Sequence, residues 1–150
     1  MKKCDLLLVH YNFDPIGKLI RVYTHSYWNH IALFISDSEL IESSRHGIKI
    51  VPLSKYKNKK LYKTKLIKTN LTESQQNIII NIVLSLRKKL TYIYRFYVLS
   101  LIAMNQFKIV PCITCSGFIA YCFSKIGVIF NKNKLISHIT PEDIRTYYEK

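Results

Sequence analysis

Acidic residues are scarce in this sequence. Nine Asp and Glu residues stand against 23 Lys and Arg residues, which gives a formal net charge of +14 at pH 7. No acid occurs between Glu42 and Glu73 or between Glu73 and Glu142, so chemistry that needs a carboxylate has few positions to draw on. The positive surplus favours an anionic partner, such as nucleic acid, acidic lipid or a polyanionic cell-wall polymer. Charge alone does not choose among these partners, and a lysine-rich face that contacts only water is the simpler interpretation.

Glycine and proline are also few, at four each, and 49% of the residues are apolar, which excludes a disordered or low-complexity chain. No repeat or linker divides the sequence, so we expect one domain, residues 1–150. The first apolar stretch is too short for a secretory signal and includes Asp5. The later apolar region, 92–110, is interrupted by charged and polar residues and falls short of a membrane span. We expect a cytoplasmic protein in which this region belongs to the core or contacts a membrane surface peripherally.

Cysteine is limited to four residues, Cys4, Cys112, Cys115 and Cys122. Two disulfides are conceivable, but without a secretory signal reduced thiols are the better expectation. Cys112 and Cys115 form one C-x-x-C motif, which is typical of a redox pair or of half a zinc site. The chain has no second such motif, and His138 alone would not complete four zinc ligands. We therefore expect no metal and no cofactor, with a thiol oxidoreductase as an alternative.

Five segments have the apolar runs or alternation of β-strands, and turn residues separate several of them. The short connections favour antiparallel neighbours. Lysines in the last of these segments indicate an edge strand, because charge there discourages pairing with other chains. The expected strands are 5–10, 30–36, 39–43, 48–52 and one within the lysine-rich segment 55–68.

Helices are indicated by spacing and by capping residues. Thr72 with Gln75, and Thr140 with Asp143, each form the sequence pattern of a capping box. Gly127 is positioned to end a helix that begins at Cys115. The expected helices are 16–25, 72 to about 90, 115–126 and the segment after 140. Together with the strands, these helices predict an α+β domain in which an antiparallel sheet, partly closed into a barrel, packs against helices.

Cys115 stands at the first position of its expected helix. Unpaired amides and the positive end of the helix dipole stabilise a thiolate there. The same amides can donate to the oxyanion that forms when a carbonyl is attacked. Cys115 is thus a candidate nucleophile, whereas a small buried apolar residue is the alternative interpretation.

A base and an orienting group are the other requirements of cysteine catalysis. Among five histidines, His30 begins the apolar strand HIALFIS, whereas His25 and His46 lie at a helix end and in a turn. Acids near the strands are limited to Asp37, Glu39 and Glu42. A carboxylate on the neighbouring strand, such as Glu42, can reach a histidine across the ladder. An ordinary strand-end histidine and a solvent-facing glutamate are the alternatives.

The order of these motifs resembles a known family. The segments IGKLIRVYTHSYWNHIALFI, ELIESSRHGIKIVPLSKY, ITCSGFIAYCFSKIGV and ITPEDI are similar to the permuted NlpC-type papain-like cysteine amidases. That family includes YiiX/YaeF-like enzymes and a group of poxvirus proteins, with lecithin:retinol acyltransferase as a distant relative. The resemblance spans most of the chain and is weakest over residues 55–110. It implies a circularly permuted papain-like fold in which His30 precedes the nucleophile.

The resemblance also implies roles. Cys115 is expected as the nucleophile, His30 as the base and Glu42 as its orienting group. The expected activity is that of a cysteine peptidase or amidase acting on a peptide, amide or acyl-ester substrate. A lipid-directed acyltransferase or hydrolase, and a non-catalytic binding protein for a polyanion, are the alternatives. The sequence leaves the oligomeric state open.

Overall fold

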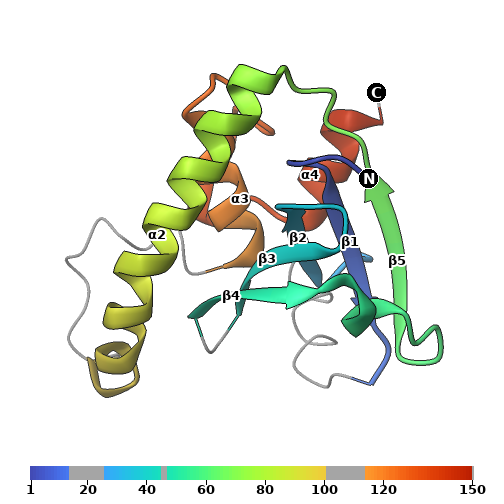
Figure 1. Ribbon diagram of the computed structural model, residues 1–150, viewed down its shortest axis with the longest axis horizontal. Coiled ribbons are helices and arrows are strands. Elements are labelled where there is room, and N and C mark those ends of the chain that lie inside the picture. Colours follow the sequence, from blue (N-terminus) through green and yellow to red (C-terminus); the bar gives the residue numbers. More distant parts are fainter. Residues whose placement is uncertain (14–25, 45–46, 101–113, 150) are drawn as a thin grey trace.

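The computed structural model describes residues 1–13, 26–44, 47–100 and 114–149, and the side chains of its longest helix as far as residue 87. These residues form an α+β fold, a five-stranded antiparallel sheet with three α-helices and two 3₁₀ helices (Figure 1). The α+β expectation is therefore confirmed. The helix expected over 16–25 lies outside the described residues, as do Cys112 and His46.

The strands are ordered β4-β3-β2-β1-β5, and every neighbouring pair is antiparallel. Each expected strand is present within a few residues, and β5 occupies an edge, as its lysines indicated. The strands are β1 (Leu6–Tyr11), β2 (His30–Phe34), β3 (Glu39–Ser44), β4 (Gly47–Pro52) and β5 (Tyr62–Ile67).

The sheet was expected to close partly into a barrel, but in the described residues it is open. Strands β4 and β5 form opposite edges of an open sheet. After β4 the chain enters the 3₁₀ helix η1 (Leu53–Tyr56) and a turn, and it rejoins the sheet beside β1. This connection carries the chain from one edge of the sheet to the other without joining the two edges.

The helices begin where their capping residues predicted. Thr72 accepts from the Gln75 amide and the Gln75 side chain accepts from the Thr72 amide, and Thr140 and Asp143 make the same reciprocal pair. Helix α2 extends about ten residues past its expected end, because residues 91–100 contain no Gly or Pro to stop it. The helices are α2 (Glu73–Ser100), α3 (Cys115–Ser124) and α4 (Pro141–Tyr148), with a second 3₁₀ helix, η3 (Ile136–His138).

The two faces of the sheet are covered differently. The first face packs against all three helices, and its core includes Ile31, Leu33, Ile79, Phe118 and Ile144. Figure 1 shows α3 between the long helix α2 and the strands. The second face carries a smaller cluster in which the side chains of η1 and β5 cover β1, β2 and β3. In the described part of the chain, no helix combines the length and the apolar character of a transmembrane span.

Candidate active site

Cys115 is the first residue of α3, as the sequence predicted. The Thr114 side chain caps this helix by accepting a hydrogen bond from the Gly117 amide at 3.0 Å. Next to the cysteine, the buried Ser116 hydroxyl donates to the Ile139 carbonyl at 2.5 Å. These contacts fix the first turn of the helix, and they leave the Cys115 side chain half-buried at its positive end.

His30 and Glu42 lie on the second face of the sheet. Leu33 pairs with Ile41 across the β2–β3 ladder, so the same register places Ala32 opposite Glu42. His30 is two residues before Ala32 and shares its face, because side chains alternate along a strand. The His30 Nε2 atom lies 3.1 Å from the Glu42 Oε2 atom. A hydrogen bond to a carboxylate requires that Nε2 carry the proton, which leaves Nδ1 for another partner.

The Cys115 sulfur also forms a hydrogen bond with the His30 ring. The backbone amides of Ile31 and Ser116 also donate to this sulfur. The short β2–β3 ladder explains the first of these amides, because it joins Leu33 and Phe34 to β3 and does not continue to residue 31. The Ile31 amide therefore donates to the start of α3 instead of to a neighbouring strand.

The electrostatics of this group favour a charged pair. Burial raises the pKa of Cys115, but the charge and hydrogen bond of His30, with the two amides, outweigh it and hold that pKa below the ordinary 9.0. Burial lowers the pKa of His30, whereas the Cys115 thiolate and Glu42 raise it, to about 9 overall. The two shifts have opposite directions, so each charged form stabilises the other and the thiolate–imidazolium form of the pair is favoured.

Glu42 is held by two further residues that no sequence pattern marked. The Lys55 ammonium and the Tyr56 hydroxyl, both on η1, donate to its two carboxylate oxygens. Burial raises the pKa of Glu42, but hydrogen bonds from His30, Lys55 and Tyr56 lower it to about 2. Desolvation and the negative charge of Glu42 raise the pKa of Tyr56 well above its usual range, so its hydroxyl remains a donor. The signal that could have pointed to such donors was the scarcity of acids. Glu42 is one of few carboxylates near the strands, and a carboxylate that is buried requires nearby hydrogen-bond donors.

The other thiols and histidines do not join this group in the described part of the chain. Cys4 and Cys122 are buried in the core of the first face. The His10 ring contacts the Tyr27 carbonyl at 2.7 Å, and His138 lies in η3. Within the described residues, Cys115 and His30 are therefore the thiol and the imidazole that lie together with Glu42.

The other acids near the strands are also separate from the site. Asp37 and Glu39 are exposed at the β2–β3 turn, so Glu42 is the buried carboxylate of this region. The described residues contain no cluster of three or more potential metal ligands.

The arrangement joins a thiol at a helix N-terminus, an imidazole and a buried carboxylate in one series of interacting side chains. A thiolate at a helix N-terminus can attack an electron-poor carbon, and the neighbouring imidazolium can return a proton to a leaving group. Comparison with known proteins adds no assignment, since no protein-family model and no curated protein matches the chain significantly.

Proposed function

We propose that the protein is a cysteine hydrolase of the amidase or peptidase type, with Cys115 as nucleophile, His30 as base and Glu42 as orienting group. The observation that carries this proposal is the series in which the Cys115 sulfur, the His30 ring and the Glu42 carboxylate are joined by hydrogen bonds. The chain order His30, Glu42, Cys115 and the α+β architecture are consistent with a circularly permuted, papain-like NlpC-type domain.

In the first half of the reaction, the Cys115 thiolate attacks the carbonyl carbon of an amide or ester. The carbonyl electrons move to the oxygen, and the backbone amide of Cys115 at the start of α3 stabilises that oxyanion. The tetrahedral species then collapses, the bond to the leaving group breaks, and the His30 imidazolium gives its proton to the departing amine or alcohol. The product is a thioester on Cys115 beside a neutral His30.

In the second half, His30 takes a proton from water as the water oxygen attacks the thioester carbonyl. Collapse of this intermediate breaks the C–S bond, releases the carboxylic acid and restores the thiolate–imidazolium pair. Glu42 fixes the His30 ring through Nε2 in both halves, so that Nδ1 stays directed at the reacting atoms. Lys55 and Tyr56 keep Glu42 ionised and immobile.

An activated ester tests this chemistry without knowledge of the natural substrate. With p-nitrophenyl acetate we expect a burst of nitrophenolate and a protein mass increase of one acetyl group, located on Cys115 by peptide mapping. The Cys115→Ala variant should lose both, whereas Cys4→Ala should keep both. If Cys115→Ala releases nitrophenolate at the wild-type rate, or if the acetyl group is found on another residue, the proposed nucleophile is wrong.

A further inference from the structure

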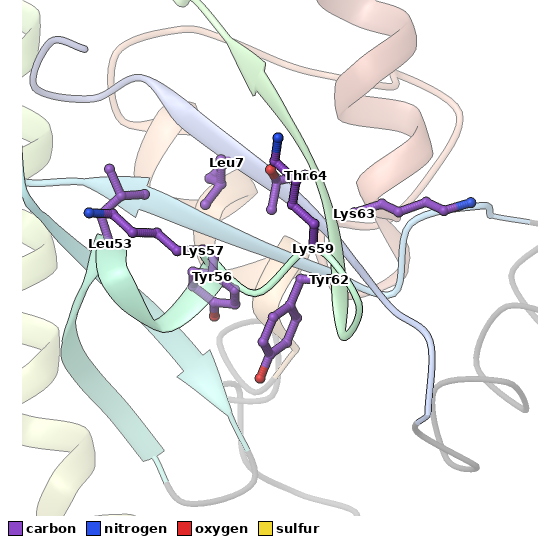
Figure 2. Close-up of a pocket in the computed structure, with 8 residues that line it drawn as sticks. All are labelled: Leu7, Leu53, Tyr56, Lys57, Lys59, Tyr62, Lys63 and Thr64. Carbon is purple, nitrogen blue, oxygen red and sulfur yellow. The ribbon is translucent and has the colours of Figure 1, made fainter.

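The second face of the sheet contains a depression of about 480 Å³ beside η1 and β5 (Figure 2). Pockets for small ligands commonly measure about 300–1,000 Å³, so this volume admits a compact molecule. Strands β1 and β5, helix η1 and the turn that follows it supply the walls. The lining residues are Leu7, Leu53, Tyr56, Lys57, Lys59, Tyr62, Lys63 and Thr64.

Positive charge without a counterion is the first notable property of this pocket. Lys57 and Lys59 form no ion pair with any residue in the described ranges, in contrast to Lys55, which pairs with Glu42. None of the eight lining residues is acidic, and the sequence has no acid between Glu42 and Glu73. The charges of Lys57 and Lys59 are therefore available to an anionic ligand.

The lining also has an apolar part. Leu7 and Leu53 contribute aliphatic surface, and Tyr56 and Tyr62 contribute their rings. The two ring centroids lie 5.2 Å apart in an edge-to-face arrangement, which is a favourable geometry for an aromatic pair. A ligand in this pocket can therefore bury apolar surface as well as contact the lysines.

The polar groups of the lining lie around this apolar surface. Figure 2 shows the side chains of Lys57 and Lys59 on either side of Leu7, with Lys59 beside Thr64. The Lys63 side chain points away from the other lysines. In this view the Lys59 side chain ends near Thr64, whereas the Lys57 side chain extends to the opposite side, beside Leu53.

We propose that this pocket binds a phosphate group attached to a small apolar moiety. Two flexible ammonium groups and the Thr64 hydroxyl match the two negative charges and several acceptor oxygens of a phosphomonoester, and lysine binds phosphate as a point charge. A carboxylate offers one charge and two oxygens, so it satisfies fewer of these donors. The apolar part of the ligand packs on Leu7, Leu53 and the tyrosine rings.

The pocket is separate from the nucleophile but shares a wall with the catalytic group. The Tyr56 ring lines the pocket, while its hydroxyl donates to Glu42. Binding of a phosphate here requires no turnover at Cys115. The proposal therefore goes beyond the hydrolase function, and it is tested by binding alone.

Phenyl phosphate is a suitable probe, followed by amide chemical shifts on the ¹⁵N-labelled full chain. We expect shifts at residues 53–64 and a dissociation constant raised about tenfold in Lys57→Gln/Lys59→Gln, because two charge-assisted contacts are removed. The matched control is Lys60→Gln/Lys68→Gln, which removes the same charge from exposed lysines of the same segment that do not line the pocket. Repetition with Cys115→Ala should give the wild-type affinity, which separates this test from the catalytic proposal.

Three results would overturn the phosphate site. The first is that both double variants weaken phenyl phosphate binding equally. The second is that benzoate binds as tightly as phenyl phosphate. The third is that the amide chemical-shift changes spread over lysines outside the pocket. Sedimentation with phosphatidylcholine vesicles, with and without phosphatidic acid, identifies the source of the phosphate. Vesicle binding that requires phosphatidic acid and is lost only in Lys57→Gln/Lys59→Gln indicates a lipid headgroup. Phenyl phosphate binding without vesicle binding indicates a soluble phosphomonoester.

Discussion

Two buried regions of the molecule each contain a thiol, and their chemistry differs. Cys4, before β1, has a pKa raised to about 12 by burial and by the neighbouring Asp5 charge. Its sulfur lies 3.6 Å from the Gln76 carbonyl, to which the thiol donates. Cys115 is also subject to desolvation, yet its pKa is lowered. Burial alone therefore makes a cysteine inert, and reactivity arises from what surrounds the sulfur.

The surroundings differ in the sign of their charges and in the hydrogen-bonding groups offered. At Cys115 the sulfur accepts hydrogen bonds from the His30 ring and from the amides of Ile31 and Ser116, all of which stabilise a thiolate. At Cys4 the nearby carbonyl accepts, so it stabilises the protonated thiol. The first turn of α3 has no acidic residue, whereas an aspartate directly follows Cys4. These differences predict which substitutions convert one kind of thiol into the other.

The largest effect is expected from His30→Ala. Without the imidazolium, burial dominates at Cys115 and its pKa rises, as the pKa of Cys4 does. A thiol with the ordinary pKa of 9.0 is only about 1% ionised at pH 7, so alkylation by iodoacetamide should slow by up to about a hundredfold. The measurement is the labelling rate at Cys115 from pH 5 to pH 10, followed by intact mass.

His10→Ala is the matched control, because His10 is also a strand histidine but contacts the Tyr27 carbonyl. It should leave the profile of Cys115 labelling unchanged. If His30→Ala is labelled as rapidly as the wild type at pH 6, then Cys115 is not activated by an ion pair with His30.

Protonation of Glu42 in acid should destabilise the fold. The pKa of Glu42 is about 2 in the folded protein against 4.5 ordinarily, so the unfolded chain binds more protons between these values and stability falls as pH falls. By pH 3 this group alone should cost about 2 kcal/mol of the free energy of unfolding relative to pH 7, roughly thirtyfold in the folding equilibrium. Urea unfolding at pH 7, 5 and 3 measures the loss.

Two variants of β3 isolate the contribution of Glu42. Glu42→Gln should show a pH dependence smaller by about 2 kcal/mol, and Glu39→Gln, which removes an exposed carboxylate from the same strand, should follow the wild type. Identical pH dependence of the wild type and Glu42→Gln would show that the pKa of Glu42 does not fall on folding.

Much of the fold could be predicted because its signals are local. Apolar runs and alternation located β1 to β5, and the capping pairs located the starts of α2 and α4. Local signals also placed His30 and Glu42 on neighbouring strands, since the two strands are consecutive and joined by a short turn, but a solvent-facing Glu42 remained an alternative. The open sheet was not predicted, because it depends on how the chain crosses from β4 to β5.

The same crossing explains why Lys55 and Tyr56 were missed. Their sequence, LSKYK, has no periodicity that marks a site, and in isolation it is only the beginning of a lysine-rich segment. Their contact with Glu42 exists because η1 follows β4 directly and lies against the second face. A long-range arrangement of this kind leaves no local pattern.

A smaller effect, about tenfold, is expected from Tyr56→Phe. Loss of the hydroxyl removes a hydrogen bond to a buried charge. The pKa of Glu42 should rise and its hold on the His30 ring should loosen, so Cys115 labelling at pH 6 should fall and its pH profile should move upward. Tyr62→Phe is the control, because the Tyr62 ring packs on Tyr56 at 5.2 Å while the phenol that donates to Glu42 belongs to Tyr56. If the two variants give the same pH profile of Cys115 labelling, the Tyr56 hydroxyl does not contribute to the site and Tyr56 serves only in packing.

The smallest effect should come from the other thiol. Cys4→Ala removes a buried sulfur from the core of the first face, so it should lower the free energy of unfolding by about 1 kcal/mol. It should not change the rate or the pH profile of Cys115 labelling, because Cys4 shares no hydrogen bond with His30 or Glu42 in the described part of the chain. Urea unfolding and labelling of the same sample measure both quantities. If the Cys115 profile moves with Cys4→Ala, the two thiols are coupled through the core, and their different chemistry cannot be assigned to local neighbours alone.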